Sequence, residues 1–101
     1  MIDNKFEFEQ FETMDQLKEY LCERDHKDSI VFENPNYLDA IIGIDEGGAV
    51  IYDYDLMAES LVEHEDMTLD DAYDFLDFNM VRTLPYINNG VRPIVNYRVR
   101  F

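Results

Sequence analysis

The sequence predicts a small single α+β domain, with a mainly antiparallel sheet of about four strands and about three helices. Its 101 residues match the usual size of one domain, so residues 1–101 are expected to fold as one unit. Hydrophobic residues make up 47% of the chain, enough for a core despite a formal net charge of −15. Segments of alternating and of helical periodicity follow one another without a regular strand–helix–strand repeat, which favours α+β.

The N-terminal third is predicted to contain a strand, a helix and a short extended segment. Residues 6–9, FEFE, alternate apolar and acidic side chains, which is typical of a half-buried strand. Thr13 follows as a helix N-cap, and the spacing of the apolar residues predicts a helix over about 13–25. A short extended segment at 29–32 and a turn at 34–36, Asn-Pro-Asn, complete this part.

The middle of the chain carries the clearest local pattern, that of a β-hairpin. Residues 40–44, AIIGI, and residues 49–54, AVIYDY, are short runs rich in β-branched and aromatic side chains. They flank the sequence DEGG, whose glycines suit a tight turn. An antiparallel pair of strands is therefore expected here.

Two further helices are predicted after the hairpin. The second helix is expected over about 55–65, with Asp53 or Asp55 as its N-cap. Thr68 is expected to cap the third helix, and Pro85 is expected to end it because proline does not continue a helix.

The chain is predicted to close with a strand over 95–101, in which apolar and polar side chains alternate. Arg98 and Arg100 would point out of this strand, and Glu7 and Glu9 would point out of the N-terminal one. Because opposite charges on neighbouring strands attract, we expect the two strands to lie side by side.

The negative charge is confined to the middle of the sequence. Between residues 28 and 81 there are fifteen acidic residues and no Lys or Arg, whereas the rest of the chain contains eight acidic and eight basic residues. Such a field repels nucleic acid and anionic membranes, and it attracts basic protein surfaces. The alternative is that the charge serves only solubility.

The acidic residues of the second and third predicted helices recur at intervals of three and four, so that each set falls on one helical face. Like charges at this spacing destabilise an isolated helix, and no basic residue relieves them. A row of carboxylates of this kind can imitate a phosphate backbone. The residues predicted to bind a partner are Asp55, Glu59, Glu63 and Asp66 on the second helix, and Asp70, Asp74 and Asp77 on the third.

Two aromatic residues flank the acidic row of the third helix. Phe75 and Phe78 lie beside the face that Leu76 and its neighbours assign to the core. Either they pack beneath the second helix, or they form an exposed aromatic patch with a rim of carboxylates. In the second case they are predicted anchors for a protein partner.

No catalytic or metal-binding pattern emerges, so we expect no enzymatic activity, no cofactor and no specific metal site. His26 and His64 lie in different elements, Cys22 has no visible base partner, and the acidic residues around the hairpin turn lack the order of a calcium-binding loop. The chain has no apolar run of membrane-spanning length, no secretory signal pattern and a single cysteine. We therefore expect a cytoplasmic protein that does not bind membranes.

The sequences DAIIGIDEGGAVIYDYDLM, DDAYDFLDFNMVRTLPYI and RPIV resemble small uncharacterised proteins encoded by phages and mobile elements of Gram-positive bacteria. The resemblance covers roughly residues 39–97 and contains no catalytic motif. In size and acidity alone, the chain is similar to anti-CRISPR proteins and to other inhibitors that mimic nucleic acids. This similarity of composition assigns no role to any residue.

These patterns predict a small acidic protein-binding module. Its expected partner is a host enzyme or defence complex with a basic, nucleic-acid-binding surface. The acidic helices would occlude that surface without catalysing a reaction. One alternative is a structural or regulatory module that forms a homodimer through its sheet edge. Another is a small-molecule binder that uses Tyr52, Tyr54, Tyr86 and Arg92.

Overall fold

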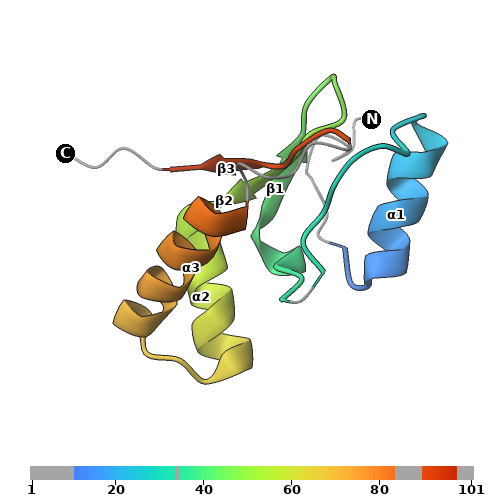
Figure 1. Cartoon of the computed structure of the whole chain (residues 1–101). Coiled ribbons are helices and arrows are strands. Elements are labelled where there is room, and N and C mark those ends of the chain that lie inside the picture. The colour runs from blue at the N-terminus through green and yellow to red at the C-terminus, as the bar shows by residue number, and fades with distance from the viewer. Residues whose placement is uncertain (1–10, 34, 84–89, 98–101) are drawn as a thin grey trace, which may run out of the picture.

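The computed structural model describes residues 11–33, 35–83 and 90–97, and within them it shows an α+β arrangement (Figure 1). Helices lie at both ends of a small sheet, with α1 on one side and the pair α2 and α3 on the other. The elements in chain order are α1 (Met14–Glu23), the short 3-10 helix η1 (Leu38–Ala40), β1 (Ile41–Ile44), β2 (Val50–Asp53), α2 (Tyr54–Glu65), α3 (Leu69–Thr83) and β3 (Ile94–Asn96).

The sheet has the order β1-β2-β3 and is mixed. β1 and β2 form the predicted antiparallel hairpin, whereas β3 pairs with β2 in parallel, with Ile51 opposite Ile94. The prediction of a mainly antiparallel sheet of about four strands was therefore only roughly right, because the described residues form three strands. The reason is that β3 begins next to the start of β2, so that both strands run in the same direction.

A second parallel contact extends this arrangement toward α1. The amide of Ile30 donates to the carbonyl of Val91 at 2.9 Å, and the amide of Val91 donates to the carbonyl of Asp28 at 2.8 Å. The predicted extended segment at 29–32 thus contributes a single bridge, between Ser29 and Val91. The strand predicted at 6–9, its pairing with the C-terminal strand, and residues 98–101 of that strand lie outside the described residues.

The helix starts follow the predicted caps. Thr13 Oγ1 accepts a hydrogen bond from the amide of Gln16 at 3.1 Å, and Thr68 Oγ1 accepts one from the amide of Asp71 at 3.1 Å. Of the two candidates for α2, Asp53 is the cap, since its Oδ1 accepts from the amide of Leu56 at 2.9 Å. Such caps satisfy amides that have no partner within the helix, so local sequence sets these boundaries well.

The hairpin turn is held by one side chain. Asp45 Oδ1 accepts hydrogen bonds from the amides of Gly47 and Ala49, both at 2.9 Å. Gly48 adopts a positive φ of 93°, which residues with a Cβ rarely adopt. It also lies against His26 and Ser29, and the Ser29 hydroxyl donates to its carbonyl at 2.6 Å. The turn therefore also fixes the loop that follows α1.

We expect Gly48→Ala to lower the free energy of unfolding by about 1–3 kcal/mol, because alanine is strained at positive φ. An added Cβ would also come within 2.8 Å of His26 Nδ1. Gly47→Ala is the matched control, since a Cβ there meets nothing closer than 3.5 Å. Denaturant titration of both variants measures the difference, and equal stabilities would contradict this account of the turn.

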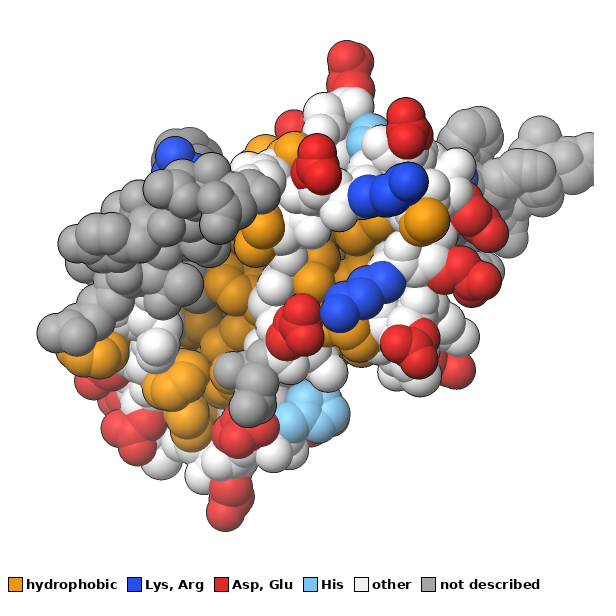
Figure 2. Space-filling model, turned by 45° about the vertical axis from the view of Figure 1, so that its right-hand side comes forward, with side chains coloured by type: hydrophobic (Ala, Val, Ile, Leu, Met, Phe, Trp, Pro, Cys, Tyr) orange, Lys and Arg blue, Asp and Glu red, His pale blue; other side chains and the backbone are white. Residues whose placement is uncertain are grey.

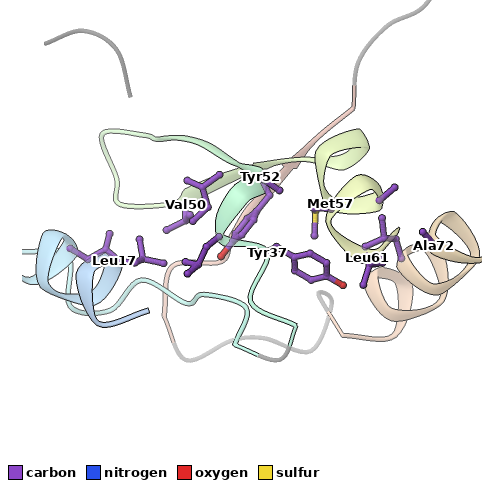
Figure 3. Packing of buried hydrophobic residues seen from close by; sticks show 13 residues of the cluster. Leu17, Tyr37, Val50, Tyr52, Met57, Leu61 and Ala72 are labelled. Carbon is purple, nitrogen blue, oxygen red and sulfur yellow. The ribbon is translucent and has the colours of Figure 1, made fainter. Parts of the chain in front are cut away.

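The core runs through the sheet from α1 to the helix pair (Figure 3). Leu17 of α1 lies at one end, Leu61 of α2 and Ala72 of α3 lie at the other, and all three are buried. Tyr52 of β2 lies between them with no exposed surface, and its hydroxyl accepts a hydrogen bond from the amide of Phe32 at 3.2 Å. A phenol in the centre thus joins the sheet to the segment before η1.

Because two tyrosines are buried, we expect the free energy of unfolding to fall at alkaline pH. Burial raises the pKa of Tyr52 from 10.0 to about 12. Burial, and then the charge of Glu65, raise the pKa of Tyr37 to about 12 as well. Each of these tyrosines has a higher pKa in the folded state than in the unfolded chain. The contribution of the neutral phenols to the free energy of unfolding is therefore complete below pH 10.0 and is lost as the pH rises from there toward about 12. Unfolding monitored across this range, together with the ring NMR signals of Tyr37 and Tyr52, checks the prediction, and ionisation of these two side chains in a fully folded protein at pH 10.0 would contradict it.

Candidate functional site

Most of the carboxylates predicted to bind a partner lie on the sides of α2 and α3 that are turned away from the core. Met57, Ala58 and Leu61 bury one side of α2, and Ala72 and Leu76 bury one side of α3. The exposed carboxylates of the predicted set that lie within the helices fall on other sides, as helical periodicity requires, and Asp66 follows α2 as its C-cap. We call them the acidic face: Glu59, Glu63, Asp66, Asp70, Asp74 and Asp77.

Asp55 does not belong to the acidic face, because its side chain is buried and not exposed as its spacing predicted. Its side chain is 8% exposed, and the Tyr73 hydroxyl donates a hydrogen bond to its Oδ1 at 2.8 Å. The spacing from Glu59 suggested a shared face, but α3 packs against the start of α2 and covers it. Burial of a carboxylate is tolerated when hydrogen bonds satisfy it, so Asp55 joins the two helices.

Asp77 is exposed but is also part of the helix contact. The Tyr54 hydroxyl donates to Asp77 Oδ1 at 2.5 Å, and the Tyr54 ring lies 5.3 Å from the ring of Tyr73 and 4.6 Å from that of Tyr97. Burial, followed by the hydrogen bond to Asp77, raises the pKa of Tyr54 well above its usual value. Two tyrosine–aspartate pairs thus hold α2 to α3, in a contact that sequence reasoning missed because their partners are 18 and 23 residues apart.

The two phenylalanines of α3 have different environments. Phe75 is half-buried and packs against the core, so it does not form an exposed patch. Phe78 is 59% exposed, the largest exposed fraction among the large hydrophobic side chains described. Phe78 alone therefore remains a candidate anchor beside the acidic face.

The acidic face has little compensation from basic residues. Glu59, Asp66, Asp70 and Asp74 form no ion pair with any described side chain. Figure 2 shows a face on which described Lys and Arg side chains (blue) border hydrophobic side chains (orange), with Asp and Glu (red) around them. A hollow of about 420 Å³ next to α1 is lined by Lys18 and Lys27.

The described residues among those considered for a small-molecule site line neither of the two described cavities. Tyr52 has no exposed surface, Tyr54 is bonded to Asp77, and Tyr86 lies outside the described residues. Arg92 is exposed. None of the three described residues lines the hollow next to α1 or a second cavity of about 570 Å³ beside α2.

One group of potential metal ligands was not visible in the sequence. Oxygen atoms of Asp39 and Glu63 and a ring nitrogen of His64 all lie within 4.8 Å of one another. His64 Nε2 is 3.1 Å from Asp39 Oδ2 and 3.7 Å from Glu63 Oε1. Asp39 precedes His64 by 25 residues, so only the packing of η1 on α2 brings them together.

Comparisons with protein families, curated proteins and solved structures found no match to this chain. None of the helices in the described segments combines the length and apolar character needed to cross a membrane.

Proposed function

We propose that this protein is a small acidic protein-binding module that occludes the nucleic-acid-binding surface of a basic partner. The observation that supports the proposal best is the acidic face itself. Its carboxylates are exposed, and most of them form no ion pair with a described side chain. All of them except Asp66, the C-cap of α2, lie on two helices that pack against each other.

The mechanism is electrostatic attraction followed by steric occlusion. Glu59 and Glu63, like Asp70 and Asp74, are four residues apart, which corresponds to a rise of about 6 Å along a helix. A partner that normally binds phosphates presents Lys and Arg at similar intervals. The field of the acidic face raises the rate of encounter with such a surface. Once docked, the module excludes nucleic acid, and this mode of action needs no catalytic group, cofactor or metal.

Phe78 supplies an apolar contact within this charged surface. Charged rims contribute mainly to the association rate and specificity, whereas buried aromatic side chains contribute much of the affinity of an interface. A side chain that is 59% exposed on the helix that carries Asp70, Asp74 and Asp77 is well placed for that role. The biological setting in this proposal is cytoplasmic counter-defence by a phage or mobile element.

An affinity capture with the whole protein as bait tests the proposal. The expected partner is a nucleic-acid-binding protein that is released as the salt concentration rises and is displaced by its own nucleic acid. Release by salt without displacement by nucleic acid would contradict occlusion. Elution of the purified chain at twice its mass at every salt concentration, with no captured partner, would instead support the homodimeric module.

A further inference from the structure

The cavity of about 570 Å³ lies between the last turn of α2 and the segment that leads into η1. One wall is apolar, because it includes Leu38, Leu61 and the ring of Tyr37, all of which are buried. The mouth of the cavity is acidic, because the more exposed lining residues include Asp39 and Glu63. An apolar wall beneath a charged mouth suits a side chain with an aliphatic stem and a charged end.

Several contributions make the mouth negative. Among the described residues that line the cavity there is no Lys or Arg. There are five carboxylates, those of Glu12, Glu33, Asp39, Glu63 and Glu65. Lys18, which lines the other hollow, is 3.4 Å from Glu33 and partly offsets that one charge. The cavity also faces the C-terminal end of α2, where the helix dipole is negative. The charge of Glu65 acts on the cavity wall, because, after burial, it contributes to the raised pKa of Tyr37.

The geometry around His64 shows how a cationic donor fits there. His64 Nε2 lies 3.1 Å from Asp39 Oδ2 and 3.7 Å from Glu63 Oε1, so two carboxylates converge on one N–H position. All three side chains are partly or largely exposed, and an incoming group can displace the imidazole. A guanidinium presents several N–H donors in one plane, so it can bond both carboxylates at once, which a single ring nitrogen cannot.

We propose that this cavity receives an arginine side chain of the basic partner, with the guanidinium between Asp39 and Glu63 and the methylene stem on Leu38 and Leu61. The inference rests on the proposed function, because it places one specific contact of the same partner beside the acidic face. It assigns Asp39, which lies outside that face, to recognition. It also gives the module a directional contact in addition to its diffuse charge.

The probe for the test is the blocked tripeptide acetyl-Gly-Arg-Gly-amide, and its matched control replaces arginine with citrulline, which is neutral and nearly the same shape. Titrations followed by amide chemical shifts are made at about 0.15 M salt, where long-range attraction is screened. We expect saturable binding of the arginine peptide, with the largest shifts at Asp39 and at residues 63–65. We expect the citrulline peptide to bind at least tenfold more weakly.

Variants of the whole chain locate the site. Asp39→Asn combined with Glu63→Gln is expected to weaken the arginine peptide at least fivefold. Glu63→Gln alone, at a side chain 71% exposed, is expected to weaken it at least twofold and preserves the fold if the double variant does not. Glu19→Gln of α1 is the control, because it removes one exposed charge at a position that neither lines the cavity nor belongs to the acidic face. It should leave the affinity unchanged.

Equal affinity for the citrulline peptide, or equal losses in Glu19→Gln and Glu63→Gln, would overturn the proposal. A Zn²⁺ titration provides a third arm: saturation of Asp39, Glu63 and His64 by micromolar Zn²⁺ without any binding of the peptide would make the site a metal centre and would also overturn it. The two proposals fail separately. If the peptide binds but nucleic acid does not displace the captured partner, only the occlusion function is rejected. If nucleic acid displaces the partner but the peptide does not bind, only the arginine site is rejected.

Discussion

Replacing Leu76 with alanine is expected to lower the free energy of unfolding by about 2–5 kcal/mol, which is the usual range for a large core side chain. Leu76 has no exposed surface and belongs to the buried side of α3. Its loss leaves a cavity under the helix that carries Asp70, Asp74 and Asp77. The variant is therefore expected to weaken the contact of α3 with α2, and partner binding should fall with it.

Phe78→Ala is the control on the same helix. Because its side chain is 59% exposed, we expect a change in stability of no more than about 0.5 kcal/mol. Partner binding should still weaken if Phe78 is an anchor. Denaturant titration compares the two variants, and a loss of less than about 1 kcal/mol for Leu76→Ala would show that α3 is not packed as described.

The parts of the fold that local sequence encodes were predicted well. Thr13, Asp53 and Thr68 cap their helices with their own side chains, and the hairpin between β1 and β2 follows from its β-branched strands and the glycines between them. These features depend on hydrogen bonds and backbone preferences within a few residues. They therefore appear in the sequence without knowledge of the tertiary structure.

The features that were missed depend on packing between distant elements. The parallel pairing of β3 joins two strands that α2 and α3 separate in the sequence, and no local residue pattern specifies it. Asp55 has the spacing of an exposed row, yet α3 covers it and Tyr73 binds it. The Asp39–His64 contact likewise arises only when η1 packs on α2. A one-dimensional pattern gives the helical face of a residue but does not show which neighbour covers that face.

Removing three charges from the acidic face is expected to weaken partner binding about tenfold or more at low salt, because steering by charge changes association rates by such factors. The variant combines Glu59→Gln, Asp70→Asn and Asp74→Asn. It retains Asp77, because that carboxylate is bonded to Tyr54 and its replacement would disturb the helix contact. The three chosen side chains are exposed, so the fold is expected to remain intact.

A variant of α1 provides the matched control for charge. Asp15→Asn, Glu19→Gln and Glu23→Gln remove the same number of exposed carboxylates from a different helix. Net charge then changes equally in both proteins, while only one of them loses the acidic face. Thermal unfolding of both variants establishes that they are folded before binding is compared.

The most direct measurement is a titration of the captured partner with the parent and both variants, at a low and a moderate salt concentration. We expect the acidic-face variant to bind about tenfold or more weakly at low salt, with a shallower salt dependence, while the α1 variant stays close to the parent. If both variants bind as tightly as the parent at both concentrations, or lose the same affinity, the acidic face is not the docking surface and its charge serves only solubility.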